Sequence, residues 1–373
     1  MLPEFSFPGP EIILRQGSKK QASIPKPLQA KKIPMETKPG NPLISVILPF
    51  YRCGEKLDTA VRSIVNQTLS LWELILVNNN ACKISEEIAL RWIRTDPRVR
   101  MIREREQSVA SAMNSGLRNA RAPLVARMDA DDISFPDRLK KQADFLGRHP
   151  ETGAVSSRAV FKSELGNSTG FSLYVRWQNS IITHREHYLS RFIESPLAQP
   201  TIMFRKELID RYGEYSTENL PEDYELWLRW FEKGVRFYKI PEPLVQWNDH
   251  GERLTRTHPG YSEEAFRRVR YEYLSRWLVE NLTDGRKLVV CGASRNIIRK
   301  AGHLSDLGVD IHGFTDVRPR RSPGINFIPY RDLADPEKYF ILNLISKRGA
   351  GEAIRSHFTS LGFIQGQHFI LAG

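Results

Sequence analysis

Three aspartates crowd into the segment Asp129-Ala130-Asp131-Asp132, directly after the apolar run Leu124-Val125-Ala126. An apolar run of this length, followed by carboxylates, predicts a buried strand whose last residues carry the acids out at the edge of a sheet. Like charges a few ångströms apart repel by roughly 1 kcal/mol in water and by several times that in a partly dry cleft. The cluster therefore needs a cation, and carboxylate oxygens are hard ligands that suit Mn²⁺ or Mg²⁺, which in turn suit phosphate oxygens.

The same region also fits a structural role at the start of a helix. Ser134 and Asp137 have the spacing of a capping box, with Asp in place of the usual Glu, and Pro136 suits a first helical turn. That role leaves Asp129 and Asp131 unexplained, because they precede the cap and share one face of an extended segment. A metal role for these two residues therefore stays open beside the structural role of the others.

The elements that would position these acids alternate along the preceding residues. Near-continuous apolar runs predict buried strands at 43–49, 72–77, 99–102 and 124–128. Amphipathic stripes predict helices at 55–68, 84–94 and 109–120. This alternation is typical of a doubly wound α/β sheet, whose ligands gather beyond the carboxyl ends of the strands.

After the acidic cluster the alternation becomes irregular. Helices are predicted at 136–148, at 206–211 and from Pro221 onward, and strands at 154–161, 201–204, 235–240 and 244–247. The stretch 162–197 shows no transferable pattern. We expect it to build a variable part of any binding site.

The composition is that of an ordinary globular protein long enough for two domains. Its 373 residues are 40% hydrophobic and 26% charged. The net charge is +12, but no basic block is long enough to indicate nucleic-acid binding. The first 41 residues hold seven Lys or Arg against three Glu, and we expect 1–41 to form a disordered or loosely attached tail.

The cysteines and the lack of long apolar stretches bear on the compartment. Cys53, Cys82 and Cys291 are far apart in the sequence and have no metal-ligand spacing, which favours reduced thiols in a cytosolic protein. No apolar run approaches the ~18 residues that cross a bilayer, and the N-terminus lacks the apolar core of a signal peptide. We therefore predict a cytoplasmic protein whose only membrane contact is peripheral, through the basic tail at the inner face of the membrane.

A second βαβ pattern follows a connecting helix predicted at 261–284. Asp316 stands 24 residues after Gly292, close to the interval at which a dinucleotide-binding unit places its ribose carboxylate. Ser294 and Ile297 occupy positions where further glycines would be needed for close approach to a pyrophosphate. We predict a small Rossmann-like α/β domain at 285–373, without a tightly bound cofactor.

Several ordered segments resemble family 2 glycosyltransferases of the GT-A type over about residues 42–258. These are Val46-Ile47-Leu48-Pro49-Phe50-Tyr51, Ser63-Ile64-Val65-Asn66-Gln67-Thr68, Glu73-Leu74-Ile75-Leu76-Val77, Ala126-Arg127-Met128-Asp129-Ala130-Asp131-Asp132, Pro136-Asp137-Arg138-Leu139 and Glu222-Asp223. Each segment is a weak signal alone, whereas their order and spacing together are specific. The resemblance implies a GT-A doubly wound domain at 42–260.

The resemblance also implies roles for single residues. Asp129 and Asp131 match the family's metal-binding Asp-any-Asp motif, with Asp131 the expected ligand of Mn²⁺ or Mg²⁺ and His250 a further ligand or phosphate contact. Asp223 matches the catalytic base, and one carboxylate opposite the leaving group implies inversion at the anomeric carbon. A helix start would also explain Glu222-Asp223, and an exposed loop would explain His250. The residues expected to contact the nucleotide are Pro49, Tyr51, Asn79, Asn80, Asn114 and Asp129.

Two departures from the family pattern affect nucleotide recognition. Asn78-Asn79-Asn80 stands where the family usually carries an acidic pair, so amides would have to read the base or ribose. Met113 stands where an arginine is expected, which puts uridine specificity in doubt. Asn114 is retained, and the resemblance implies that it orients the acidic loop.

The expected activity is metal-dependent, inverting transfer of a sugar from a nucleotide-diphosphate sugar to a hydroxyl of a glycan, a lipid-linked molecule or another acceptor. Surface polysaccharide, exopolysaccharide or other glycan assembly is the expected setting. Sugar-phosphate nucleotidyl transfer would need a Gly-rich basic loop after the first strand, and 49–54 does not supply one. A degenerate transferase acting as a nucleotide-sugar or protein scaffold would explain the Asn triplet but would not need Asp131 and Asp223.

Overall fold

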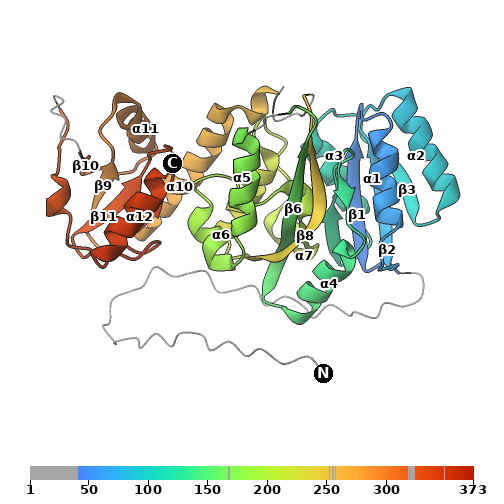
Figure 1. The fold of residues 1–373 in the computed structure, drawn as a ribbon, viewed down its shortest axis with the longest axis horizontal. Coiled ribbons are helices and arrows are strands. Elements are labelled where there is room, and N and C mark those ends of the chain that lie inside the picture. The colour runs from blue at the N-terminus through green and yellow to red at the C-terminus, as the bar shows by residue number, and fades with distance from the viewer. Residues whose placement is uncertain are drawn as a thin grey trace.

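The computed structural model describes residues 41–166, 169–251, 253, 256, 258–317, 324–347 and 349–373. These residues form an eight-stranded sheet and a four-stranded sheet that lie at opposite ends of an elongated molecule (Figure 1). The tail predicted at 1–41 lies outside the described residues except for Asn41.

The first half of the large sheet is the doubly wound arrangement that the sequence predicts. Its parallel strands are β1 (Ile44–Phe50), β2 (Trp72–Asn78), β3 (Val99–Arg103) and β4 (Leu124–Arg127). The helices between them are α1 (Lys56–Val65), α2 (Lys83–Thr95) and α3 (Val109–Asn119). The order β3-β2-β1-β4 brings the carboxyl ends of all four strands to one edge of the sheet.

The near-continuous apolar runs reflect burial on both faces of this sheet. Val46 and Leu48 of β1 pack with α1, whereas Ile47 points to the other face and packs with α3. Both faces of the sheet are therefore buried. The strands consequently lack the alternation of polar and apolar residues that is typical of a sheet with one face in solvent.

The second half of the large sheet mixes strand directions in the order β4-β7-β6-β8-β5. Its strands are β5 (Ile133–Ser134), β6 (Thr152–Ser163), β7 (Met203–Arg205) and β8 (Arg236–Asp249). Its helices are α4 (Arg138–Arg148), α5 (Thr169–Ser180), α6 (His184–Ser190), α7 (Glu207–Tyr212) and α8 (Glu222–Glu232), with a 3₁₀ turn η1 (Gln199–Thr201). Strand β7 runs antiparallel to β4 and β6, and β5 runs antiparallel to β8.

Two local predictions in this half are wrong. Strand β8 is continuous over 14 residues, where the sequence predicts two strands, because shifts of register against β6 near Arg158 accommodate Pro241 and Pro243. Ser134 does not cap a helix, since it lies in β5 and its hydroxyl accepts a hydrogen bond from Gln67 Nε2 at 3.1 Å. Helix α4 begins without a side-chain cap from Asp137.

The C-terminal sheet has four parallel strands in the order β10-β9-β11-β12. They are β9 (Lys287–Cys291), β10 (Gly313–Thr315), β11 (Tyr339–Asn343) and β12 (Phe369–Leu371). The accompanying helices are α10 (Glu263–Asn281), α11 (Arg295–Asp306) and α12 (Ala350–Ser360), with 3₁₀ turns η2 (Pro259–Tyr261) and η3 (Tyr330–Asp332). This is a second small parallel sheet, while the Rossmann-like assignment and the domain boundaries stay predictions.

Helix α10 joins the two sheets through a shared core. Val269 and Leu274 of α10 belong to the same apolar cluster as Tyr224 and Leu228 of α8 and Leu288 of β9. The C-terminal sheet therefore packs, through α10, against the helix that begins with Glu222 and Asp223.

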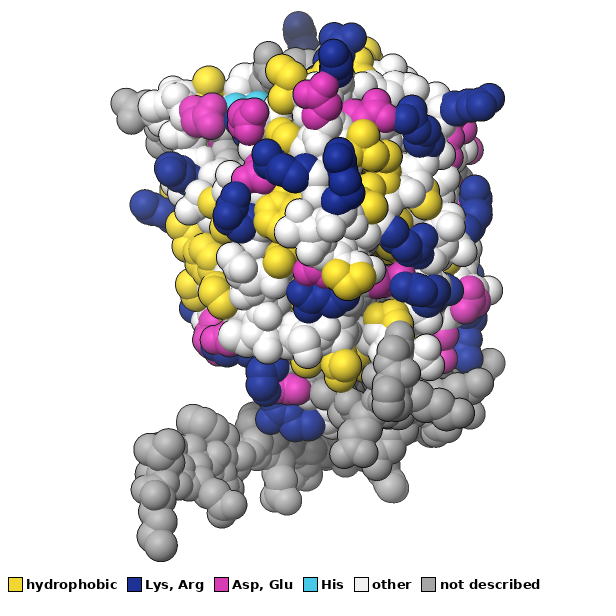
Figure 2. All heavy atoms as spheres, turned by 90° about the vertical axis from the view of Figure 1, so that its right-hand side faces the viewer, with side chains coloured by type: hydrophobic (Ala, Val, Ile, Leu, Met, Phe, Trp, Pro, Cys, Tyr) yellow, Lys and Arg dark blue, Asp and Glu magenta, His cyan; other side chains and the backbone are white. Residues whose placement is uncertain are grey.

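Charge is mixed on the end of the molecule that Figure 2 shows, where Lys and Arg lie interspersed with Asp and Glu. Helices α1 and α2 lie at this end in Figure 1, and Asp58 of α1 pairs there with Arg62 and Arg91. The excess positive charge is therefore not gathered into one patch on this face. Among the described residues, no helix has both the length and the apolar character needed to span a bilayer.

Candidate active site

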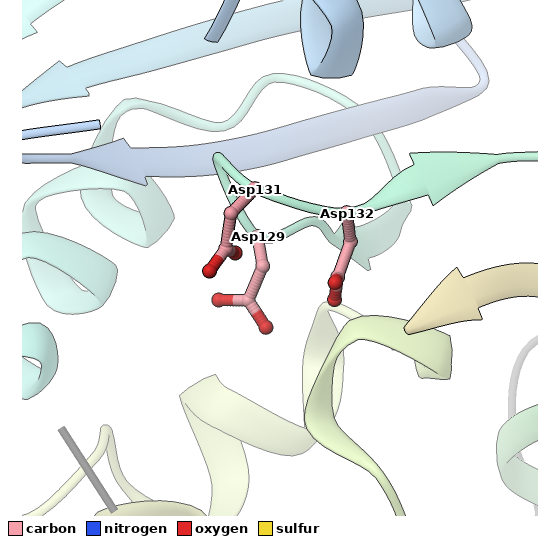
Figure 3. Close-up of side chains that lie close together, drawn as sticks. All are labelled: Asp129, Asp131 and Asp132. Carbon is pink, nitrogen blue, oxygen red and sulfur yellow. The ribbon is translucent and has the colours of Figure 1, made fainter. Parts of the chain in front are cut away.

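The three aspartates lie on the turn between β4 and β5, and their side chains point to the same side of that turn (Figure 3). One oxygen from each of Asp129, Asp131 and Asp132 lies within 4.8 Å of the other two. Strand β4 is buried between β1 and β7, so the chain delivers the acids at the carboxyl edge of the parallel half of the sheet. This confirms the strand that the sequence places before the acids.

The end of β8 closes over this acidic turn. Asn248 donates its backbone N–H to Asp132 Oδ1 at 2.8 Å and its side-chain amide to the carbonyl oxygen of Asp131 at 2.6 Å. His250 Nε2 lies 2.6 Å from Asp131 Oδ2. The structure therefore brings His250 to the aspartates, and it adds Asn248, which sequence reasoning missed because nothing in the local pattern separates it from any polar residue at a strand end.

Asp132 carries the feature that best fits a metal ion. Its side chain is 1% exposed, and its Oδ2 has no hydrogen-bond partner in the described part of the chain. Burial and the charges of Asp129 and Asp131 raise the pKa of Asp132 well above its usual range. A buried carboxylate oxygen without a donor, beside two further carboxylates, is a donor set that suits Mn²⁺ or Mg²⁺.

Asp131 is held in its charged form by its neighbours. Burial raises the pKa of Asp131, but the hydrogen bond with His250 and the charge of Arg253 outweigh burial, so that the pKa lies below its usual value. An ionised carboxylate is the form that binds a metal. Asp131 is thus suited to the ligand role implied by the resemblance.

Arg127 is a buried cation that sequence reasoning gave no role. Its side chain is almost fully buried in β4, and Nη1 forms an ion pair with Asp129 Oδ1. Burial lowers the pKa of Arg127, but the charge of Asp129 more than compensates, with further support from Glu222. The sequence did indicate a role for Arg127, because an arginine inside an apolar strand needs a charged partner. The pair neutralises part of the negative charge of the acidic turn.

Asp223 lies in the same electrostatic environment as the acidic turn. It is the second residue of α8, and its Oδ1 accepts a hydrogen bond from the Tyr224 backbone N–H at 2.7 Å. Burial and the charge of Glu222 raise the pKa of Asp223 to about 7, with Arg127 lowering it and Asp129 raising it. A carboxylate that changes charge near neutral pH suits a general base. The bond to Tyr224 shows that a helix-start role coexists with this suitability.

Glu222 links the start of α8 to the segment that precedes α10. Its buried carboxylate accepts a hydrogen bond from the Tyr261 hydroxyl at 2.6 Å. Burial raises the pKa of Glu222, whereas this hydrogen bond and the charge of Arg127 lower it. Tyr261 was not predicted, since 39 residues separate it from Glu222.

The expected nucleotide contacts fall at the carboxyl ends of β1 and β2. Pro49 lies in β1 and Tyr51 directly after it, while Asn79 and Asn80 follow β2, the strand paired with β1. Asn79 Nδ2 donates to the carbonyl oxygens of Glu104 at 3.1 Å and Glu106 at 2.6 Å. Asn80 Nδ2 donates to the carbonyl oxygen of Arg105 at 3.0 Å. The side-chain N–H groups therefore hold the loop after β3, which leaves the amide oxygens to accept hydrogen bonds from a base or ribose.

Asn114 of α3 is bonded to the segment that follows α7. Its buried amide donates to the carbonyl oxygen of Tyr215 at 2.8 Å and accepts from the Tyr215 N–H at 3.0 Å. Both ends of the amide are thus used to hold the segment after α7. Among the described residues, these bonds join Asn114 to Tyr215 and not to the acidic turn.

The pKa of Asp223 leads to a prediction for activity against pH. If ionised Asp223 accepts the acceptor proton, kcat/KM should rise with pH through about 7 and then level off. Glu222→Gln removes one of the charges that raise this pKa, so the midpoint should move to lower pH. Initial rates from pH 5 to 9 measure both curves. A midpoint that is unchanged in Glu222→Gln would contradict the assignment of the titrating group.

A family model described as "Glycosyl transferase family 2" matches residues 45–213. The amylovoran biosynthesis glycosyltransferase AmsE of Erwinia amylovora is 30% identical over 207 residues, which cover 55% of this chain and 75% of AmsE. The putative glycosyltransferase EpsE of Bacillus subtilis is 29% identical over 229 residues, which cover 59% of this chain and 78% of EpsE. Residues 45–213 contain the acidic turn and the large sheet except for β8 and the first residue of β1.

The fold also resembles a solved structure. The crystal structure of S. aureus TarS 1-349, in complex with UDP-GlcNAc, superposes with a TM-score of 0.51 at 16% sequence identity and covers 70% of each chain. At this identity the likeness concerns the fold alone, and it supports the mixed α/β arrangement of the GT-A type.

Proposed function

Because the chain belongs to glycosyltransferase family 2, we propose that it moves a sugar from a nucleotide-diphosphate sugar to an acceptor hydroxyl, with inversion at the anomeric carbon and with the help of a divalent cation. One observation carries the proposal. Asp129 of the β4–β5 turn and Asp223 of α8 lie close to the same buried cation, because Arg127 forms an ion pair with Asp129 and its charge lowers the pKa of Asp223.

The acidic turn is the proposed metal site. Asp131 and Asp132 would hold Mn²⁺ or Mg²⁺, with Asp129 and His250 as the further candidates beside them. When bound, the cation supplies positive charge that stabilises the departing nucleoside diphosphate. Asn248 fixes the backbone of this turn, which keeps the carboxylates on one side.

Asp223 is the proposed general base. It would accept the proton of the acceptor hydroxyl as that oxygen forms its bond to the anomeric carbon. A single carboxylate that acts as base on the side opposite the leaving group implies one displacement and therefore inversion. The buried Glu222 beside it keeps the pKa of Asp223 near the pH at which a base works well.

The donor side is proposed at the ends of β1 and β2. Pro49 and Tyr51 would border the nucleotide, and the oxygens of Asn79 and Asn80 would accept hydrogen bonds from its base or ribose. Since AmsE is named as a glycosyltransferase of amylovoran biosynthesis, we place this chain in glycan assembly, with a glycan or lipid-linked acceptor at the inner face of a membrane.

A binding experiment tests the donor and the cation together. Melting temperatures measured with a panel of nucleotide-diphosphate sugars, each with and without Mn²⁺, should rise for one donor and rise further with the ion. At a donor concentration 100 times Kd the gain in stability should be about 2.7 kcal/mol. No shift with any donor in the presence of Mn²⁺ would contradict the proposal. Binding without hydrolysis or transfer would instead favour a scaffold.

A further inference from the structure

Two cysteines from separate loops meet at one serine hydroxyl. Cys53 follows β1 and Cys82 precedes α2, so they lie 29 positions apart in the sequence. Cys53 Sγ lies 3.5 Å from Ser85 Oγ, and Cys82 Sγ lies 3.2 Å from the same oxygen. Backbone bonds hold the loops together, because Cys82 N donates to the carbonyl oxygen of Tyr51 at 3.3 Å and Gly54 N donates to Ser85 Oγ at 3.0 Å.

The two thiols differ in pKa, as expected when one cysteine reacts with an oxidant and the other then forms a disulfide with it. The hydrogen bond with the Ser85 hydroxyl, followed by backbone N–H groups at the start of α2, lowers the pKa of the partly exposed Cys82 thiol. Burial raises the pKa of Cys53, and the charge of Asp131 adds to this effect. Cys82 is therefore the better nucleophile, while Cys53 is a neutral thiol next to it.

The third cysteine offers a contrast within the same chain. Cys291 is buried at the end of β9, and burial, with the charge of Asp316, raises its pKa to about 12. A thiol of this kind is inert toward oxidants, because the thiolate is the reacting form.

We infer that Cys82 and Cys53 form an oxidative modification site, at which a peroxide converts the Cys82 thiol to a sulfenic acid and the Cys53 thiol resolves it to a disulfide. In the first step the Cys82 sulfur attacks one peroxide oxygen, the O–O bond breaks, and with hydrogen peroxide the other oxygen leaves as water. In the second step the Cys53 sulfur attacks the Cys82 sulfur, the S–O bond breaks, and hydroxide leaves with the Cys53 proton as a second water. Two thiols are oxidised and one peroxide is reduced.

The site lies beside the proposed donor pocket. Cys53 follows Tyr51, and the charge of Asp131 reaches it. Each sulfur now contacts the Ser85 hydroxyl, which also accepts the Gly54 N–H. Drawing the two sulfurs together to the ~2.05 Å of an S–S bond should therefore shift the loop from Tyr51 to Gly54. This effect on the donor, which rests on the proposed function, is separate from the formation of the disulfide itself.

Mass spectrometry of the full chain tests the modification without any assay of activity. After treatment with hydrogen peroxide, the intact mass should fall by two hydrogens, and digestion without reduction should give one cross-linked peptide that contains Cys53 and Cys82. Cys53→Ser should give no cross-link and should accumulate a Cys82 sulfenic acid that dimedone traps. Cys291→Ser should behave as the wild type.

Several outcomes would overturn the inference. They are a dimedone adduct mainly on Cys53 or Cys291, a disulfide that joins two chains rather than one, and no oxidation of Cys82 at a dose that oxidises free glutathione. Cys82→Ser distinguishes the reacting thiol, since it should leave Cys53 unmodified at the same dose. If the disulfide forms but sugar transfer by the oxidised protein equals that of the protein reduced with dithiothreitol, the effect on the donor site is wrong and the modification stands.

Discussion

Replacing Asp223 by Asn should lower the rate of sugar transfer by about 10²–10⁴-fold, which is the usual contribution of a general base. The amide is nearly isosteric, and its oxygen can still accept the hydrogen bond from the Tyr224 N–H at the start of α8. The helix start is therefore preserved while the proton acceptor is lost. Because the variant also removes a buried group whose pKa is raised to about 7, the fold should not be destabilised at pH 8.

The raised pKa of Asp223 makes the free energy of unfolding depend on pH. The folded protein binds a proton at Asp223 more tightly than the unfolded chain does, since the folded pKa of about 7 lies above the ordinary value of 3.8. The stability that this group contributes is fully present below about pH 4 and is lost as the pH rises through 7. A neutral Asn carries no such cost.

Steady-state transfer at saturating donor and Mn²⁺, together with urea unfolding, measures both quantities. The matched control is Asp210→Asn on α7, an exposed first-turn acid whose loss should leave the rate unchanged. Asp223→Asn with wild-type turnover would mean that the carboxylate serves the helix start alone. Unchanged donor binding in a slow variant would support the role as base.

Replacing Asp131 by Asn should weaken Mn²⁺ binding by more than about 100-fold, which exceeds the effect usual for residues that only support a ligand. The substitution removes the carboxylate that His250 and Arg253 keep ionised, and it leaves a neutral amide in its place. The ion would then depend on Asp129, whose carboxylate is paired with Arg127, and on Asp132, whose other oxygen is bonded to Asn248. Sugar transfer should fall with the affinity for the metal.

Calorimetric titration with Mn²⁺ in the absence of donor gives the affinity directly, so that this result does not depend on catalysis. Asp144→Asn on α4, where the carboxylate pairs with Lys140 at 2.6 Å, is a control remote from the acidic turn. A variant with wild-type Mn²⁺ affinity would remove Asp131 from the metal site. His250→Gln should have a smaller effect, because it takes away one neighbour of the carboxylate and leaves the carboxylate itself.

The first half of the large sheet could be predicted from local sequence because its evidence is local. Each of β1, β2 and β4 is a short and largely apolar run, and the amphipathic helices α1, α2 and α3 alternate with the strands, so burial on both faces of the sheet is the placement that such a run favours. The position of the acids after β4 could be predicted as well, because a chain that leaves a parallel strand emerges at the carboxyl edge of the sheet.

The local rules failed where long-range packing competed with them. The spacing of Ser134 and Asp137 satisfies a capping box, yet pairing of β5 with β8 takes Ser134 into the sheet. Pro241 and Pro243 interrupt the pattern of a strand, yet the shifts of register against β6 carry β8 through them. Propensity is a weak preference that a sheet partner can override.

By itself the sequence determined the parallel half of the sheet, the carboxylates at its edge and the family to which the chain belongs. The tertiary structure alone decided which residues contact those carboxylates. Asn248 bonds to Asp132, 116 positions away in the sequence, and His250 contacts Asp131, 119 positions away, because β8 lies next to β5 in the sheet and pairs with it. The tertiary structure likewise decided that Arg127 neutralises Asp129 and that Cys53 meets Cys82 at Ser85. Hydrophobic periodicity reports whether a residue is buried, whereas the partner of a buried charge depends on the order of strands in the sheet, which no local pattern encodes.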